Sequence, residues 1–283
     1  MLGRMDRNRP PSHEDRRPSR TAAFFDLDKT IIAKSSTLAF SKPFHAGGLI
    51  NRRVVLRSTY AQFVFLLGGA DHDQMERMRQ YLSSMVTGWD VQTVRDIVAE
   101  TLHHIVDPIV YDEAVTLIEQ HRAEGRDVVI VSSSGYEVVE PIGRLLGADR
   151  VIATKMVVAD GKYTGEIEHY VYGPEKVRAV VELAATEGYD LANSFAYSDS
   201  VTDTPMLEAV GHPVAVNPDK GLRRIATERG WPVQDFTEPV GLSERTGLRA
   251  VRTPVLAATA IGAGAAAAGL VIYAAKRRRT DAT

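Results

Sequence analysis

Residues 22–30 read AAFFDLDKT, four apolar side chains followed directly by two aspartates two positions apart. An apolar run of this kind, from Thr21 to Phe25, is typical of a short strand buried on both faces of a parallel sheet. Asp26 would then lie at the carboxyl end of that strand. Because open parallel sheets bind their ligands beyond these ends, the stretch predicts both the fold class and the edge that carries function.

Further short apolar runs alternate with helical patterns along the rest of the chain. The expected strands cover residues 127–132, 151–154, 195–198 and 213–216, and the expected helices cover residues 113–124, 138–146, 175–187 and 204–210. Strands that alternate with helices indicate an α/β protein. We therefore predict a doubly wound, Rossmann-like parallel sheet.

Two segments interrupt this alternation. Residues 36–106 contain helical stretches at 53–67, 73–86 and 91–102 and no convincing strand, which predicts a helical cap inserted after the first strand. The catalytic core would then comprise residues 22–35 and 107–240. The segment Met156 to Tyr172 alternates around Asp160-Gly161, a turn pair that predicts a β-hairpin beside the main sheet.

The two aspartates of the opening stretch can act together. In an extended loop alternate side chains point the same way, so Asp26 and Asp28 can converge on one point. Two adjacent carboxylates repel each other unless a cation or a shared proton relieves them, and Mg²⁺ is the hard, oxygen-binding cation that suits them. Taken alone, the motif is equally well explained as a solvated acidic turn.

Three later segments favour phosphate chemistry. Ser132, Ser133 and the next two residues, Ser-Gly, follow the second strand and offer hydroxyls and backbone amides to phosphate oxygens at a helix start. Lys176 stands near the start of another helix, where an ammonium can neutralise phosphate. Asp199 and Asp203 follow the strand at 195–198. Each segment has an ordinary explanation alone, as a serine-rich turn, a surface lysine or a helix N-cap, but their order together points to a site.

With these motifs in this order, the chain resembles the haloacid dehalogenase superfamily of phosphohydrolases over about residues 22–237. The motifs of that family are DxDx[TV], a strand ending in Ser or Thr, a Lys, and a late acidic pair. The helical insertion is similar to the cap of its phosphoserine phosphatase-like branch. The run YSDSVTDTPMLEAVGHPVAVNPD, residues 197–219, is similar to that of membrane-tailed members of the branch.

The resemblance implies a role for each matching residue. Asp26 would be the nucleophile that becomes an aspartyl phosphate, and Asp28 the general acid and then the base. Mg²⁺ would be held by the Asp26 carboxylate, the Asp28 backbone carbonyl and Asp199, with Asp203 in support.

The remaining matches concern phosphate and the loop. Ser132 and Lys176, with Ser133 beside them, would bind the transferring phosphoryl group, and Lys176 would also keep Asp26 ionised. Thr30 would brace the loop through its hydroxyl. The substrate implied is a phosphate monoester.

Departures from the family pattern leave the ester open. Phosphoserine phosphatases usually carry a Glu nine residues after the nucleophile, and this chain has Ser35 there. In the late motif, usually GDGxND, Ser198, Ser200 and Thr202 replace both Gly and the Asn. The leading hypothesis is a membrane-tethered, Mg²⁺-dependent phosphomonoesterase whose substrate is a small-metabolite or lipid phosphate. A phosphoserine phosphatase is the alternative within this chemistry, and a catalytically silent membrane scaffold is the alternative of another class.

Composition excludes several other classes. Lys and Arg total 34 against 36 Asp and Glu, a net charge of −2 that gives no reason to expect a nucleic-acid partner. The chain has no cysteine, which excludes a disulfide framework, a thiolate zinc site and a cysteine nucleophile.

The two ends differ from the core. Residues 1–21 are basic and nearly devoid of apolar side chains, which predicts a disordered arm. After a linker at 241–253, residues 254–275 carry no charge and are followed by a basic tail at 276–283. As a helix this run would reach roughly 33 Å, enough for a hydrocarbon core of about 30 Å. We expect a single-pass membrane protein with a cytoplasmic catalytic domain. An Ala-rich helix packed on the soluble domain is the alternative.

Overall fold

The computed structural model describes residues 20–50, 83–237 and 239. The predicted helical stretch 53–67, most of the stretch 73–86, the linker, the transmembrane helix at 254–275 and the basic tail lie outside these residues. So does the basic arm before residue 20. Within the described ranges, no helix is both long and apolar enough to cross a membrane.

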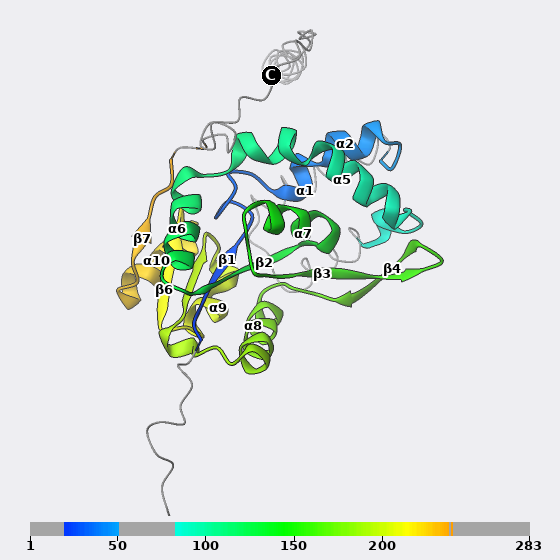
Figure 1. The fold of residues 1–283 in the computed structure, drawn as a ribbon. Coiled ribbons are helices and arrows are strands. Elements are labelled where there is room, and N and C mark those ends of the chain that lie inside the picture. Colours follow the sequence, from blue (N-terminus) through cyan, green and yellow to red (C-terminus); the bar gives the residue numbers. More distant parts are fainter. Residues whose placement is uncertain (1–19, 51–82, 238, 240–283) are drawn as a thin grey trace, which may run out of the picture. The chain divides into compact units, whose positions relative to one another are not determined.

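The described elements follow the predicted alternation of strands and helices (Figure 1). In chain order they are β1 (Ala22–Asp26), α1 (Ser36–Ala39), α2 (Ser41–Ala46), α5 (Val91–Val106), η2 (Asp107–Ile109), α6 (Asp112–Ala123), β2 (Asp127–Gly135), α7 (Tyr136–Leu145), β3 (Arg150–Ala159), β4 (Lys162–His169), α8 (Pro174–Glu187), η3 (Leu191–Asn193), β5 (Phe195–Ser198), η4 (Val201–Asp203), α9 (Thr204–Glu208), β6 (His212–Val216), α10 (Lys220–Arg229) and β7 (Val233–Gln234).

Seven strands form one sheet in the order β4-β3-β2-β1-β5-β6-β7. Every neighbouring pair is parallel except β3 and β4. Asp26 pairs in register with Val131, and Phe25 pairs with Tyr197. The carboxyl ends of β1, β2 and β5 therefore meet at one edge of the sheet, as the sequence predicts.

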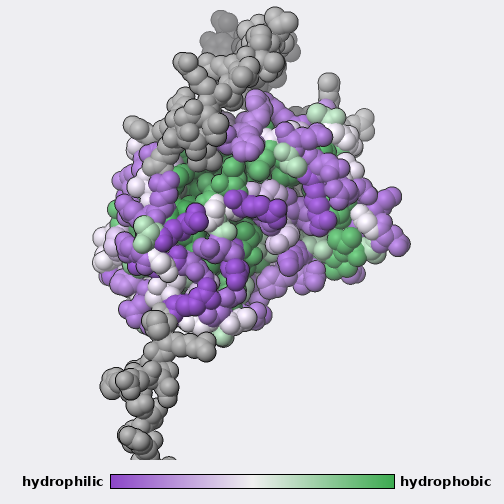
Figure 2. All heavy atoms as spheres, in the orientation of Figure 1, coloured by the Kyte–Doolittle hydropathy of each residue, from purple (hydrophilic) through white to green (hydrophobic). Residues whose placement is uncertain are grey.

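Hydrophobic cores lie on both faces of the sheet, which explains why β1 is apolar throughout. Ala23 and Phe25 belong to one core, which includes buried residues of α6 and α7. Ala22 and Phe24 belong to the other, which includes buried residues of α8, α9 and α10. The doubly wound prediction is confirmed. On the face drawn in Figure 2, hydrophilic side chains dominate the surface and hydrophobic ones show mainly between them.

The predicted hairpin is confirmed, with one difference in its setting. Asp160 and Gly161 form its turn, with φ of 50° and 74°. However, β3 runs unbroken from the main sheet into the hairpin, so the hairpin extends the sheet instead of lying beside it (Figure 1). The start of α5 is hydrogen-bonded to the turn of this hairpin, since the Val91 amide donates to the Gly161 carbonyl at 2.9 Å.

Candidate active site

The loop after β1 turns sharply to place a threonine beside Asp26. Lys29 adopts the left-handed conformation, with φ of 65°, which is unusual for a residue with a side chain. This bend lets the Ile31 amide donate to the Leu27 carbonyl at 3.0 Å. The Thr30 hydroxyl then donates to Asp26 Oδ2 at 3.2 Å. Thr30 therefore lies where a bracing role requires it.

A buried lysine joins two carboxylates from different parts of the chain. Lys176 is 3% exposed, and its Nζ donates to Asp26 Oδ1 at 2.5 Å and to Asp203 Oδ2 at 2.7 Å. It is the third residue of α8, where the helix dipole disfavours positive charge. The two carboxylates compensate for this position and for the loss of water around the ammonium. The predicted residues Asp26, Lys176 and Asp203 thus form one cluster.

Ser198 extends this cluster, and its contribution was not predicted. Its hydroxyl donates to Asp203 Oδ2 at 2.7 Å and accepts from the Ser200 amide at 3.2 Å. Ser198 is fully buried at the end of β5. In the sequence, Ser198 stands out only because it replaces the first glycine of the late motif. Nothing in the sequence indicates its hydrogen bond to Asp203.

Asp199 lies within electrostatic range of the same cluster. Burial raises the pKa of its carboxyl to about 7, and the charges of Asp203 and Asp219 act in the same direction while Lys29 opposes them. The Asp199 backbone carbonyl accepts from the Asp219 amide at 2.8 Å. Asp219 also accepts from the Val201 amide at 3.0 Å and so fixes the loop that carries Asp199. Sequence reasoning missed Asp219, although its position before α10 is typical of an N-cap.

The charges at this edge of the sheet suit a bound cation. Burial raises the pKa of Asp26 to about 8, Lys176 lowers it, and the carboxylates of Asp203, Asp199 and Asp28 raise it further. The carboxylates here outnumber the positive charges and are buried or partly buried. A hard divalent ion such as Mg²⁺, which prefers oxygen ligands, would offset this excess of negative charge. No three acidic or imidazole side chains gather into a metal site among the described residues. The predicted set requires only two carboxylates, Asp26 and Asp199, and the Asp28 carbonyl.

The three serines lie within β2, which continues to Gly135 and not only to residue 132 as expected, and they divide between two environments. Ser132 is fully buried, and its hydroxyl accepts from the Ser134 amide at 3.1 Å. Ser133 is exposed. The Ser134 hydroxyl, which the sequence offers to phosphate oxygens along with its neighbours, instead donates to Asp28 Oδ2 at 2.8 Å. Asp28 is thus held by residues other than those that hold Asp26.

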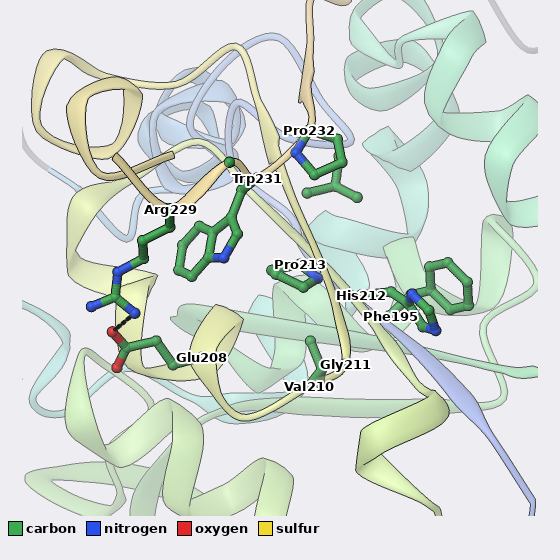
Figure 3. A pocket seen from close by; sticks show the side chains of 11 residues that line it. Phe195, Glu208, Val210, Gly211, His212, Pro213, Arg229, Trp231 and Pro232 are labelled. Carbon is green, nitrogen blue, oxygen red and sulfur yellow. Dashed lines mark ion pairs between the residues drawn. The ribbon is translucent and has the colours of Figure 1, made fainter. Parts of the chain in front are cut away.

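A pocket of about 720 Å³ lies elsewhere in the fold and includes none of these residues. It is lined by Phe195 and His212, at the starts of β5 and β6, and by Trp231 after α10. Figure 3 shows the ion pair of Arg229 with Glu208 at one end of it. Because Asp26 and Ser198 end their strands, this pocket lies at the opposite edge of the sheet from the candidate active site.

Comparison with known proteins agrees with this geometry. A family model described as haloacid dehalogenase-like hydrolase matches residues 23–208. The chain is 68% identical over 262 residues to a Streptomyces azureus protein named inhibition of morphological differentiation protein, covering 92% of this chain and 95% of that one. It is 62% identical over 261 residues to a probable phosphatase of Mycobacterium tuberculosis, covering 92% and 90%. It is 34% identical over 261 residues to a phosphoserine phosphatase of the same organism, covering 92% and 81%.

The matched range contains Asp26 at the end of β1 and Asp28 in the loop that follows. It also contains the serines of β2, Lys176, and the acidic pair Asp199 and Asp203. Each of these lies at the carboxyl edge of a parallel, doubly wound sheet. On the sequence match and this arrangement together, the chain belongs to the haloacid dehalogenase-like hydrolase family and is a phosphatase.

Proposed function

We propose that this phosphatase hydrolyses phosphate monoesters through a covalent intermediate on Asp26. The observation that carries the proposal is the buried contact of Lys176 with both Asp26 and Asp203. A lysine enclosed between two carboxylates is costly to desolvate, and a structural ion pair of this kind is often replaceable by apolar residues. Here the ion pair lies next to a sharply bent loop and a second aspartate. Buried charges in such a setting are typical of functional sites, and they favour the interpretation of Asp26 as a reactive carboxylate.

The first half of the reaction forms a bond to Asp26. A carboxylate oxygen of Asp26 attacks phosphorus, the bond between phosphorus and the ester oxygen breaks, and Asp28 gives its proton to that departing oxygen. In the second half a water attacks the aspartyl phosphate and gives its proton to Asp28. Inorganic phosphate leaves and Asp26 is restored, so that each turnover consumes one ester and one water.

Lys176 and a divalent ion would stabilise the charge on the phosphoryl oxygens. Lys176 already faces Asp26 and would meet the oxygens that gather negative charge during transfer. Mg²⁺, when bound by Asp26, Asp199 and the Asp28 carbonyl, supplies positive charge and fixes the phosphoryl geometry. Ser132 lies in the neighbouring strand β2, three residues before its end, and we assign phosphate binding to it and Ser133.

The proposed substrates are small-metabolite or lipid phosphates. Phosphoserine is the second candidate, supported by the relative of that name. Ser35, partly buried next to Ser36, has no carboxylate to pair with the ammonium of phosphoserine, and an ammonium that loses water without a partner binds weakly. We expect phosphoserine to be no better a substrate than other esters in a metabolite panel. A specificity constant for phosphoserine far above the rest would reverse this ranking.

We further propose that residues 254–275 tether the enzyme to a membrane. The support is the sequence itself, 22 consecutive uncharged residues followed by Lys276 and three arginines. A tether of this kind would concentrate the site near lipid phosphates.

The proposal is tested by phosphate release from a panel that includes lysophospholipid and phosphatidylglycerol phosphates. We expect release to require Mg²⁺, to stop in excess chelator, and to fall by orders of magnitude in Asp26→Asn. Full release by Asp26→Asn would contradict the mechanism. A silent scaffold would release no phosphate from any ester, and its cellular role would survive the substitution.

A further inference from the structure

Hydrogen-bond donors occupy both carboxylate oxygens of Asp28. The Ser36 amide, at the start of α1, donates to Oδ1, and the Ser134 hydroxyl donates to Oδ2 at 2.8 Å. These donors lie 98 positions apart, one in the segment predicted as the cap and one at the end of β2. The orientation of the Asp28 carboxylate is therefore fixed from two independent parts of the fold.

The hydroxyls around Ser134 form a chain that ends on Asp28. Ser134 has one hydroxyl proton and gives it to the carboxylate, so in its other contacts it accepts. The Ser36 hydroxyl donates to Ser134 Oγ at 2.9 Å, and Thr37 Oγ1 lies 3.2 Å from the same atom. Ser36 is fully buried and Ser134 is 8% exposed, so the protein rather than bulk water supplies these bonds.

A general acid works only when its proton lies on the line to the leaving oxygen. The carboxylate of an aspartate rotates easily about its last bond, and a misaligned group loses much of the gain that proximity provides. A hydroxyl donor can hold such a group in both states, because a carboxyl oxygen keeps a lone pair for the Ser134 proton whether or not it is protonated, and its own proton is then left to point toward the leaving oxygen. The Ser36 amide can only donate, so it holds Oδ1 as an acceptor and leaves Oδ2, beside Ser134, to carry the proton.

We propose that Ser134 is a positioning residue for proton transfer, which aligns Asp28 toward the leaving oxygen and connects it to Ser36 in α1. The inference rests on the proposed function, because it assigns Asp28 the acid role. Ser134 acts on the reaction through Asp28 and is not itself assigned a contact with the substrate.

Two substrates that differ in their need for an acid separate this role from a structural one. p-Nitrophenolate leaves without protonation, whereas the alkoxide of glycerol phosphate requires it. General acid catalysis contributes about 10²–10⁴-fold, so we expect Ser134→Ala to lower kcat by about 10- to 100-fold on glycerol phosphate. On p-nitrophenyl phosphate we expect a loss below about 3-fold, with KM nearly unchanged for both esters. Ser134→Thr, which keeps the hydroxyl, should recover most of the loss.

Matched variants provide the controls. Ser41→Ala removes a hydroxyl that donates to the Leu38 carbonyl in α1 and should change neither rate. If Ser36 and Ser134 act as one chain, Ser36→Ala combined with Ser134→Ala should cost less than the product of the single losses. If Ser134→Ala does not fold, Ser134→Cys, a weaker donor of similar size, should show the same preference for p-nitrophenyl phosphate.

Equal losses on the two esters, a change confined to KM, or no recovery by Ser134→Thr would overturn the inference. The failure of the proposed function is a separate result: wild-type protein would then release phosphate from neither ester in the presence of Mg²⁺.

Discussion

The ammonium of Lys176 is enclosed by protein, and its bonds to Asp26 and Asp203 make it the residue on which the candidate site depends most. Removing one partner from a buried charge cluster costs about 3–5 kcal/mol, because the remaining charges have no counterion. We expect Lys176→Met to lower the free energy of unfolding by about that amount and to abolish phosphate release. Urea unfolding followed by circular dichroism measures the first effect, and a phosphate assay the second.

A second substitution provides the control for Lys176. In Lys176→Met the carboxylates of Asp26 and Asp203 both lack a counterion. Adding Asp203→Asn removes one of these two charges, so it should restore part of the lost stability. A Lys176→Met protein within about 0.5 kcal/mol of wild type would show that the ion pair is unimportant for folding.

His121 offers a test at the residue scale away from the site. Its Nδ1 accepts from Arg126 Nε at 2.6 Å, so Nε2 carries the proton and donates to the Tyr197 hydroxyl at 2.7 Å. Burial, and then the Arg126 charge, lower the pKa of His121 to about 4, below its unfolded value of about 6.5. The unfolded chain therefore binds more protons between these values, and stability falls as the pH drops from about 6.5 toward 4, by up to about 1.4 kcal/mol per pH unit.

His121→Gln lacks the titrating group and keeps a polar side chain there. We expect its free energy of unfolding to fall less steeply over the same pH range than that of wild type, measured by urea titration at a series of pH values. Parallel profiles for the two proteins would contradict the assignment.

At the scale of the element, the pattern of apolar runs predicts the alternation of strands and helices best at the centre of the sheet, because β1, β2 and β5 are buried on both faces. It misses β7, which has only two residues, and α10, whose sequence KGLRRIATER is largely charged. It predicts the edge where Asp26, Lys176 and Asp203 meet, since that edge follows from parallel topology. It does not predict the contacts of Ser134 or Ser198, because these depend on the path of loops that no periodicity describes.

Close packing between elements makes a further prediction at this scale. A Cβ added at Gly211, just before β6, would lie 1.7 Å from the Ala192 carbonyl oxygen in η3. Since backbone must move to accommodate it, Gly211→Ala should destabilise the protein by at least about 1–3 kcal/mol in thermal or urea unfolding. Gly135→Ala is the matched control, because a Cβ there meets nothing within 4 Å and the backbone φ is −66°. Equal stability of the two variants would refute this packing.

At the scale of the whole molecule, the proposed tether predicts where the protein is found. A spanning helix satisfies its backbone hydrogen bonds internally, so the full-length chain should sediment with membranes and resist extraction by alkaline carbonate. A chain truncated after Ser243 should lose this behaviour and still cleave small esters, because every residue assigned to the site, including Asp219, precedes residue 220. Full-length protein in the soluble fraction, or released by salt, would exclude the span and favour the packed Ala-rich helix.

The proposed mechanism requires a covalent bond to phosphorus at Asp26. The most direct measurement is to stop the reaction during turnover with Mg²⁺ and ester present, reduce the protein with borohydride, and sequence the peptide containing residues 22–30 by mass spectrometry. An aspartyl phosphate would be reduced to homoserine at position 26, in wild type and not in Asp26→Asn, while Asp28, Asp199 and Asp203 stay unchanged. Homoserine at another aspartate, or none during active turnover, would contradict the account.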